Sequence, residues 1–300
     1  MLKIAWSPQY VLSLPANHRF PMSKYELLPQ QLIHEGTITE SNLFAPDLME
    51  EKWITRTHEA TYWQKLKDLS LTAKEIRRTG FPLTRELISR EVIIASGTLQ
   101  CALHALTHGV AMNIAGGTHH AFSDRGEGFC LLNDIAIAAN YLLDSAIVNR
   151  ILVVDLDVHQ GNGTAQLFRN ESRVFTFSMH GANNYPMIKE QSDLDIGLRD
   201  HTDDAFYLRT LEANLKNILD DFEPQFIFFQ SGVDILDTDK LGKLSVSRAG
   251  CRTRDRLVFS LARNNKIPLV ASMGGGYSPD FRDIIEAHAN TFRLAQEIYF

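Results

Sequence analysis

The feature that most constrains the fold of this chain is an alternation of short apolar runs with helix-like segments from residue 91 onward. The apolar runs, such as Ile-Leu-Val-Val at 151–154 and Phe-Ile-Phe-Phe at 226–229, are continuous. Strands covered by helices on both faces have this character, because side chains on both faces are buried. Strands that alternate with helices indicate a parallel sheet. We therefore predict an α/β fold with one open parallel sheet and helices on both faces.

The predicted elements follow one another without a long linker. We expect helices at residues 91–108, 133–143, 203–222, 248–263 and 281–298, and strands at 110–115, 151–157, 173–180, 225–230 and 268–273. The segment 203–222 shows the helical period well, because its leucines are spaced by three and four residues. No Pro-, Gly- or Ser-rich stretch divides the chain, so we expect one domain over residues 1–300.

Clusters of polar side chains follow four of the predicted strands. They are Gly116-Gly-Thr-His-His120, Asp155-Leu-Asp-Val-His159, Gln230-Ser-Gly-Val-Asp234 and Met273-Gly-Gly-Gly-Tyr277. In an open parallel sheet, ligands bind outside the carboxyl ends of the strands. The convergence of four such ends on one rim predicts a catalytic site there.

One of these clusters has the pattern of a metal site. Asp155, Asp157 and His159 alternate with apolar residues, and the strand period of two would point all three the same way. Burying them unpaired would be costly, and a metal ion would remove that cost. With Asp234 as a third ligand, two carboxylates and one imidazole leave a coordination position free, as catalytic sites do. The alternative is a hydrogen-bonded polar cluster without a metal.

The remaining clusters supply groups for acid–base chemistry. The adjacent imidazoles of His119 and His120 could divide the roles of general base and general acid, with Asp155 as a partner that tunes one of them. The phenol of Tyr277, after three glycines, could donate a hydrogen bond to an oxyanion. The alternative interpretation is that the Tyr277 ring only fills space in a glycine-rich loop.

Several other residues have no such context. Cys101, His104 and His108 share one helical face, which packing of the helix on the sheet explains better than metal binding. A further set of histidines lies outside every motif, and we expect these side chains at the surface: His34, His58, His201 and His288.

Composition excludes several classes of protein. The 300 residues include 36 acidic and 30 basic side chains, and a net charge of −6 argues against sequence-independent binding of nucleic acid. No apolar run approaches the ~20 residues needed to span a bilayer, so we expect no membrane association. Three cysteines, at 101, 130 and 251, favour a reducing compartment, and we predict a cytoplasmic protein. Nothing in the sequence indicates an oligomeric state.

Taken together, the motifs resemble the histone deacetylase family, within the arginase/deacetylase fold. The matching stretches occur in the family's order and span most of the chain: Gly116-Gly-Thr-His-His-Ala-Phe122, Gly128-Phe-Cys-Leu-Leu-Asn-Asp134, Val153-Val-Asp-Leu-Asp-Val-His159, Ser231-Gly-Val-Asp234 and Gly274-Gly-Gly-Tyr277. Details such as Ser123-Asp-Arg-Gly-Glu-Gly-Phe129 resemble the class IV branch and its bacterial members.

The resemblance implies a role for each site residue. It implies Zn²⁺ on Asp157, His159 and Asp234, although such an O,O,N donor set also suits Fe²⁺. It further implies an acid–base pair with Asp155 hydrogen-bonded to His119, an oxyanion donor at Tyr277, and an acyl-lysine tunnel. The residues expected along that tunnel are Gly128, Phe129, Tyr185 and Gly275. A structural monovalent cation such as K⁺ is implied near Asp155, Asp157, His159 and Ser178.

One position departs from most of the family. Asn162 stands where most members have Asp, as the expected partner of His120. An amide brings no negative charge, so it should raise the pKa of that imidazole less. The class IV branch shares this Asn, and we interpret it as tuning of the base. The chain shows no clear counterpart of the rim aspartate with which many members hold a peptide backbone.

Three functions are therefore compared. The favoured one is a zinc-dependent amide hydrolase acting on an acylated lysine peptide or an acylated small amine. The second is a dimanganese ureohydrolase on the same fold, which requires further carboxylates that Asn162, Asp237 and Asp239 do not supply convincingly. The third is an inactive acyl-lysine binding module. Metal analysis would separate them, with one zinc-like ion, two manganese ions or none.

Overall fold

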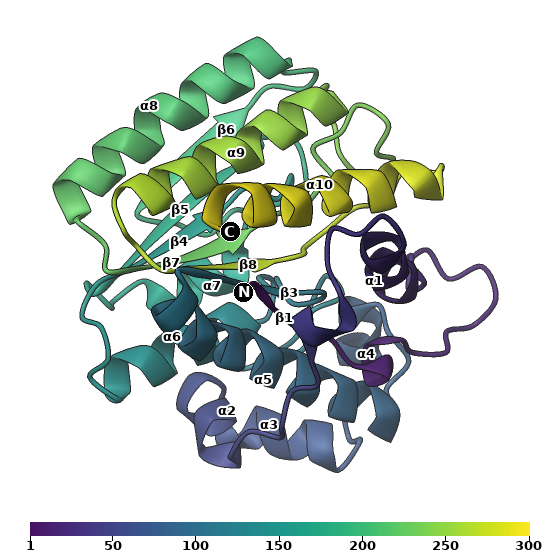
Figure 1. Ribbon diagram of the computed structural model, residues 1–300. Coiled ribbons are helices and arrows are strands. Elements are labelled where there is room, and N and C mark those ends of the chain that lie inside the picture. Colours follow the sequence, from purple (N-terminus) through teal and green to yellow (C-terminus); the bar gives the residue numbers. More distant parts are fainter.

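One parallel sheet of eight strands forms the centre of the computed structural model, which describes residues 1–300 (Figure 1). The strand order is β2-β1-β3-β8-β7-β4-β5-β6, and every neighbouring pair is parallel. The strands are β1 (Lys3–Ala5), β2 (Leu43–Phe44), β3 (Val110–Asn113), β4 (Ile151–Asp155), β5 (Val174–Gly181), β6 (Leu194–Leu198), β7 (Phe226–Gln230) and β8 (Leu269–Ser272).

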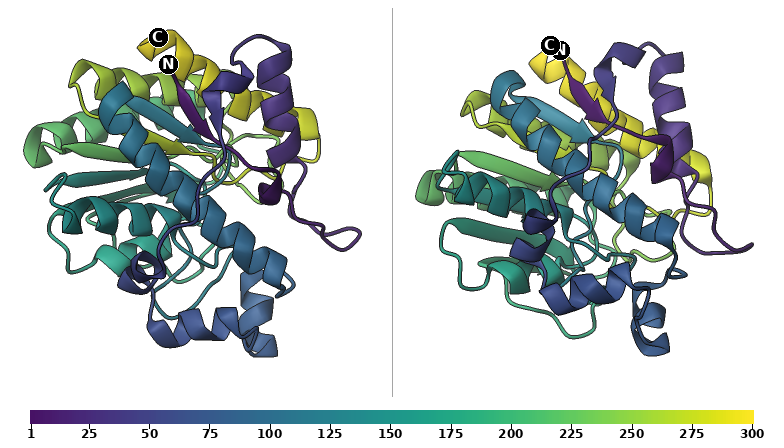
Figure 2. Two further views of the ribbon diagram at one scale, coloured as in Figure 1. Left: turned by 60° about the horizontal axis from the view of Figure 1, so that its bottom comes forward. Right: turned by 90° about the horizontal axis from the view of Figure 1, so that it is seen from below.

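Helices cover both faces of this sheet (Figures 1 and 2). On one face lie α5 (Arg85–His108) and α6 (Asp134–Asp144), with α2 (Glu51–Thr57) and α3 (Ala60–Lys67) outside them. The other face carries α8 (Asp204–Phe222), α9 (Arg248–Asn264) and α10 (Phe281–Tyr299), with α1 (Lys24–His34) against α10. The short helices are α4 (Ala73–Thr79), α7 (Asn162–Phe168) and the 3-10 turns Pro8–Tyr10 and Glu40–Asn42.

The core explains why the central strands are apolar throughout. In β4, Ile151 and Val153 pack into the cluster that contains side chains of α5 and α6. Leu152 and Val154 pack into the cluster on the opposite face, with side chains of α8, α9 and α10. Alternate residues of a strand point to opposite faces, so a strand between two helix layers needs an apolar residue at every position. The predicted α/β fold is confirmed.

The structure also contains elements that the sequence analysis did not predict. The strand β6 was missed because it is an edge strand with a half-polar sequence, Leu-Asp-Ile-Gly-Leu. The short helices α2, α3, α4 and α7 were missed as well. The helix α5 begins at Arg85 rather than at residue 91, because the Thr84 side chain accepts a hydrogen bond from the Leu87 N–H and caps it there.

Two expectations about single residues were wrong. Strand β4 ends at Asp155, so Asp157 and His159 lie in the following loop and not in the regular alternation of a strand. In this loop the Asp157 N–H donates to the Asp155 side chain (3.2 Å) instead of to a neighbouring strand. In addition, His58 and His288 are each only 1% exposed, whereas His34 and His201 are at the surface as expected.

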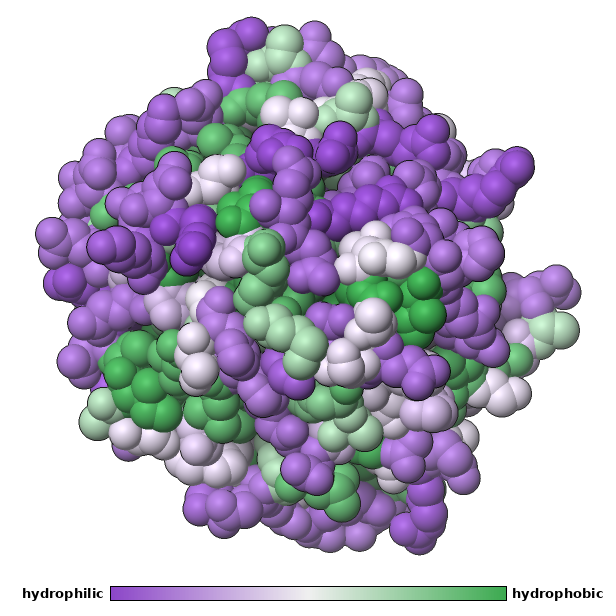
Figure 3. Space-filling view, in the orientation of Figure 1, coloured by the Kyte–Doolittle hydropathy of each residue, from purple (hydrophilic) through white to green (hydrophobic).

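The surface of the molecule is mainly polar, as its content of charged residues leads one to expect. The face shown in Figure 3 is largely hydrophilic, with small separate apolar patches. None of the helices is both long and apolar enough to cross a membrane.

Candidate active site

The sheet order brings the four polar clusters together. The strands β3, β8, β7 and β4 are consecutive neighbours in the sheet, and each is followed by one of the clusters. Because all strands are parallel, their carboxyl ends lie along one edge. The predicted convergence at a single rim is therefore what the topology produces.

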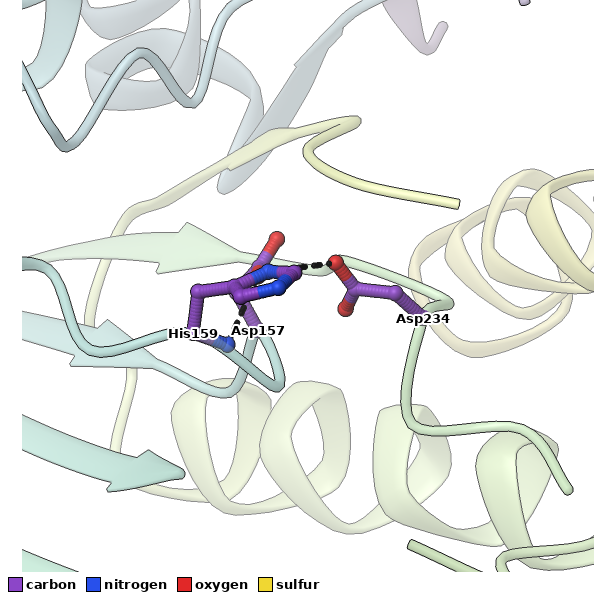
Figure 4. Close-up of side chains that lie close together, drawn as sticks. All are labelled: Asp157, His159 and Asp234. Carbon is purple, nitrogen blue, oxygen red and sulfur yellow. Dashed lines mark hydrogen bonds and ion pairs between the residues drawn. The ribbon is translucent and has the colours of Figure 1, made fainter. Parts of the chain in front are cut away.

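At this rim, Asp157, His159 and Asp234 form a compact group of ligand atoms (Figure 4). One donor atom from each lies within 4.8 Å of the others. His159 Nδ1 is 3.1 Å from Asp157 Oδ1 and 3.1 Å from Asp234 Oδ2. The three residues named as metal ligands from the sequence are thus brought together, and all three lie in loops, Asp157 and His159 after β4 and Asp234 after β7.

Backbone N–H groups orient the two carboxylates. The Gly275 N–H donates to Asp157 Oδ2 and the Val158 N–H donates to Asp234 Oδ1, both at 2.9 Å. The other oxygen of each carboxylate is therefore directed at His159 Nδ1. A side chain at position 275 would overlap Asp234 Oδ2, so only glycine allows the loop to lie this close.

The charge of this group fits a divalent cation. Burial and the negative charge of Asp157 raise the pKa of Asp234, because two buried carboxylates side by side repel each other. A bound cation would compensate both charges. Two carboxylates and an imidazole are ligands that zinc accepts, and they leave a coordination position open.

The two adjacent histidines have different partners. His119 Nδ1 lies 2.6 Å from Asp155 Oδ2. Burial alone would lower the pKa of His119, but the charge of Asp155, with that of Asp157, raises it to about 9. The hydrogen bond that the sequence predicted is present, and it favours a protonated His119.

His120 has an amide instead of a carboxylate as its partner. Its Nδ1 lies 2.7 Å from Asn162 Oδ1, and its ring centre is 4.1 Å from that of His119. Burial lowers the pKa of His120 well below its ordinary value, and the positive charge of the neighbouring His119 lowers it further. The hydrogen bond that His120 donates to Asn162 acts in the opposite direction but is outweighed. His120 is therefore the neutral member of the pair.

Tyr277 lies in the loop after β8. Its backbone N–H donates to Asp239 Oδ2 (2.6 Å), which fixes this end of the glycine loop. The ring centres of Tyr277 and His159 are 6.5 Å apart. Burial raises the pKa of Tyr277 well above its ordinary value, as do the charges of Asp234 and Asp157. The phenol therefore stays protonated and can donate a hydrogen bond.

Two cavities meet at these residues. The outer cavity, of about 250 Å³, is lined by His120, His159, Tyr277 and three predicted tunnel residues: Gly128, Phe129 and Tyr185. The Tyr185 ring meets the His120 ring edge-on, with centres 5.0 Å apart. The fourth tunnel residue is placed differently, because Gly275 lines a smaller inner cavity of about 40 Å³ beside Asp157.

Sequence reasoning gave no role to three residues that support the site. Asp134 accepts hydrogen bonds from the N–H groups of Gly117 and Thr118 and so fixes the loop before the histidine pair. Gln230 donates to the Gly117 carbonyl (2.9 Å), and Glu127 accepts a hydrogen bond from Asn162 (2.7 Å). All three lie inside the motifs quoted above, but nothing in a sequence shows which groups they contact.

Comparison with known proteins identifies the family. The model of the histone deacetylase domain matches residues 18–292, and the chain belongs to this family.

Similar proteins include an uncharacterized protein of Picosynechococcus, which is 40% identical over 99% of both chains. Histone deacetylase 2 of Arabidopsis thaliana is 30% identical over 92% of this chain and 74% of its own length. Among solved structures, an HDAC homologue from Aquifex aeolicus matches with a TM-score of 0.83 and 24% identity, covering 97% of this chain and 82% of that one. This last likeness concerns the fold.

Proposed function

We propose that this protein is a zinc-dependent amide hydrolase that removes an acyl group from acylated lysine or a related acylated amine, with residues 1–300 as one catalytic domain. The observation that carries the proposal is the arrangement at the base of the outer cavity. There, a buried Asp-His-Asp group lies next to two histidines of unlike charge and a protonated tyrosine.

Each residue has a chemical task in this reaction. A zinc ion held by Asp157, His159 and Asp234 would polarise the acyl carbonyl and lower the pKa of its bound water. The neutral imidazole of His120 takes the proton of the attacking water. The hydroxyl of Tyr277 donates to the oxyanion as the carbonyl carbon becomes tetrahedral.

Collapse of the tetrahedral species requires a proton for the leaving amine. His120, protonated in the first step, lines the cavity and supplies that proton. His119, kept protonated by Asp155, adds positive charge next to the developing negative charge. The products are a free amine and a carboxylate.

The site favours this chemistry over its rivals. A dimanganese centre needs a second set of ligands, and the structure contains one group of His, Cys, Asp or Glu side chains that could hold a metal ion, in which Asp237 and Asp239 take no part. An inactive binding module would not need a histidine pair with separate charge states. Fe²⁺ in place of Zn²⁺, a K⁺ ion near Ser178 and a cytoplasmic location remain predictions from the sequence.

Hydrolysis of a panel of acyl-lysine peptides, from acetyl to myristoyl, tests the proposal. The purified chain would be measured after chelation and again after one equivalent of zinc is restored. We expect release of the acyl group as a carboxylate, leaving an unacylated lysine in the peptide; this release should be lost on chelation, return with zinc and be absent in Asp157→Asn. If no peptide of the panel is hydrolysed although one zinc is bound per chain, the proposal of a peptide deacylase is overturned. Acetylated polyamines and other small amides would then be tested as substrates.

A further inference from the structure

The carboxylate of Glu127 lies behind the amide that holds the catalytic base. Glu127 Oε1 accepts a hydrogen bond from Asn162 Nδ2 at 2.7 Å, and Asn162 Oδ1 is 2.7 Å from His120 Nδ1. The three side chains form one chain of hydrogen bonds that ends on the imidazole. All of it lies in the interior or close to it, because Asn162 and His120 are 2% and 5% exposed and the Glu127 side chain is 13% exposed.

The direction of every hydrogen bond in this chain follows from chemistry. A carboxylate has only acceptor atoms, so the amide group that faces Glu127 must be the NH₂ of Asn162. The carbonyl oxygen of Asn162 then faces His120 and can only accept. His120 Nδ1 must therefore carry the proton, which leaves the lone pair on Nε2.

This arrangement explains how an asparagine can serve at residue 162, where most of the family has aspartate. An aspartate at that position would accept from His120 in either orientation of its side chain, since both of its oxygens are equivalent acceptors. An asparagine offers an oxygen on one side and a donor on the other, and a flipped amide would hold the imidazole in the wrong tautomer. Something must therefore fix the amide, and Glu127 is the group in contact with its NH₂.

The loop that carries Glu127 is itself well held. The Gly128 and Phe129 N–H groups donate to the carbonyls of Arg78 and Thr79, at 3.1 and 2.8 Å. The guanidinium Nε atoms of Arg78 and Arg125 both lie 3.9 Å from Glu127 Oε2 and compensate its charge without taking over the oxygen that binds Asn162. The same loop passes close to the base, because a side chain at position 128 would overlap the His120 ring.

We propose that Glu127 is a positioning residue that fixes the amide orientation of Asn162 and thereby keeps His120 in the tautomer with a free Nε2. The proposal rests on the function proposed above for His120. Glu127 does not line the outer cavity, and its main effect is expected on the chemical step.

The kinetic test is a double-mutant cycle with Asn162. In Glu127→Gln, two amides face each other and can pair in either orientation, so the tautomer of His120 is no longer specified. We expect kcat to fall roughly tenfold, as for loss of one charge-assisted hydrogen bond, with little change in KM. In the Asn162→Asp protein, the carboxylates at 127 and 162 repel each other. Adding Glu127→Gln to this protein removes the repulsion and supplies an N–H donor to Asp at 162. In the Asn162→Asp background, Glu127→Gln should therefore raise kcat.

A reversal of sign distinguishes positioning from a merely structural role. A fall in kcat of equal size in both backgrounds, or no fall in the Asn162 protein, would overturn the proposal. The matched control is Asp124→Asn, which removes a carboxylate of the same loop that pairs with Arg125 (2.8 Å) and does not contact Asn162. It should leave kcat unchanged, and thermal melting of all variants would report folding.

A second readout does not depend on activity. In the zinc-loaded full chain with ¹⁵N-labelled histidine, NMR should show His120 protonated at Nδ1, and Glu127→Gln should show a mixture of the two neutral tautomers. Protonation at Nε2 in the unaltered protein, or an unchanged single tautomer in Glu127→Gln, would refute the proposal. Should no acyl-lysine peptide be hydrolysed, the function fails, while this measurement still decides the role of Glu127.

Discussion

The two sides of the site hold a histidine in contrasting surroundings. On the inner side, His119 faces the buried carboxylate of Asp155, and its pKa is raised despite burial. On the side of the outer cavity, His120 faces the amide of Asn162, and its pKa is lowered. The rings are neighbours, so depth does not explain the difference. The partner decides the charge, and the charge decides the role.

The largest expected effect comes from removing each histidine of the pair in turn. His120→Ala should lower kcat by about 10²–10⁴, because it removes the general base. His119→Ala should cost less, since it removes a nearby positive charge and not the proton acceptor. Steady-state kinetics on one acetyl-lysine peptide would measure both. An equal or larger loss in His119→Ala would mean that the assignment of the base is wrong.

The next largest fall in kcat should come from loss of the Tyr277 hydroxyl. Tyr277→Phe keeps the ring and removes the donor, so kcat should fall by about 10²–10³. The matched control is Tyr299→Phe, where the lost hydroxyl donates to the Phe259 carbonyl far from the site (3.3 Å). Unchanged turnover in Tyr277→Phe would remove this residue from the mechanism.

A smaller effect on activity should come from giving His120 a carboxylate partner, as His119 already has. Asn162→Asp places a negative charge beside His120 and raises its pKa. The base must be neutral to act, so the acidic limb of the pH profile of kcat/KM should move to higher pH, by about one unit. A shift to lower pH, or none, would show that the partner does not set the charge of His120.

A last prediction concerns stability instead of activity and uses a histidine outside the site. His58 is buried without a carboxylate, its Nδ1 bonded to the Phe122 carbonyl and its Nε2 to the Asn133 N–H. Burial lowers the pKa of His58 to about 4, from an ordinary value of 6.5. The unfolded chain then binds the extra proton, so stability should fall as the pH falls from 6.5 to about 4.

Chemical unfolding at several pH values would measure this contribution. His58→Gln should flatten the dependence of the unfolding free energy on pH, by an amount on the order of 3 kcal/mol across that range. The exposed His34→Gln is the control and should leave the slope unchanged. An equal slope in His58→Gln and the unaltered protein would contradict burial as the cause of a lowered pKa.

The sequence was sufficient for the parts of the site that follow from sheet topology. Continuous apolar runs identified the buried strands, and their carboxyl ends pointed to one rim, so the residues at 119, 157, 234 and 277 could be placed together. The argument from strand period failed for Asp157 and His159, because a loop begins where Asp155 accepts a hydrogen bond from the chain that follows. The ligands meet through that loop and the loop after β7, which carries Asp234.

Other features depend on contacts that no local pattern encodes. A histidine outside any motif gives no periodic signal, and His288 is buried although neither of its ring nitrogens has a hydrogen-bond partner. Glu127 and Asn162 are 35 residues apart in the chain and meet only in the folded structure. The motif that contains Glu127 could be recognised, whereas its contact with the amide could not.

The charge states of the histidine pair test this account most directly. Histidine-labelled, zinc-loaded protein would be examined by ¹⁵N NMR near neutral pH, with His119→Ala and His120→Ala used to assign the signals. The account predicts that His119 is protonated on both ring nitrogens and that His120 is neutral with a free Nε2. A neutral His119 beside a charged His120 would contradict it.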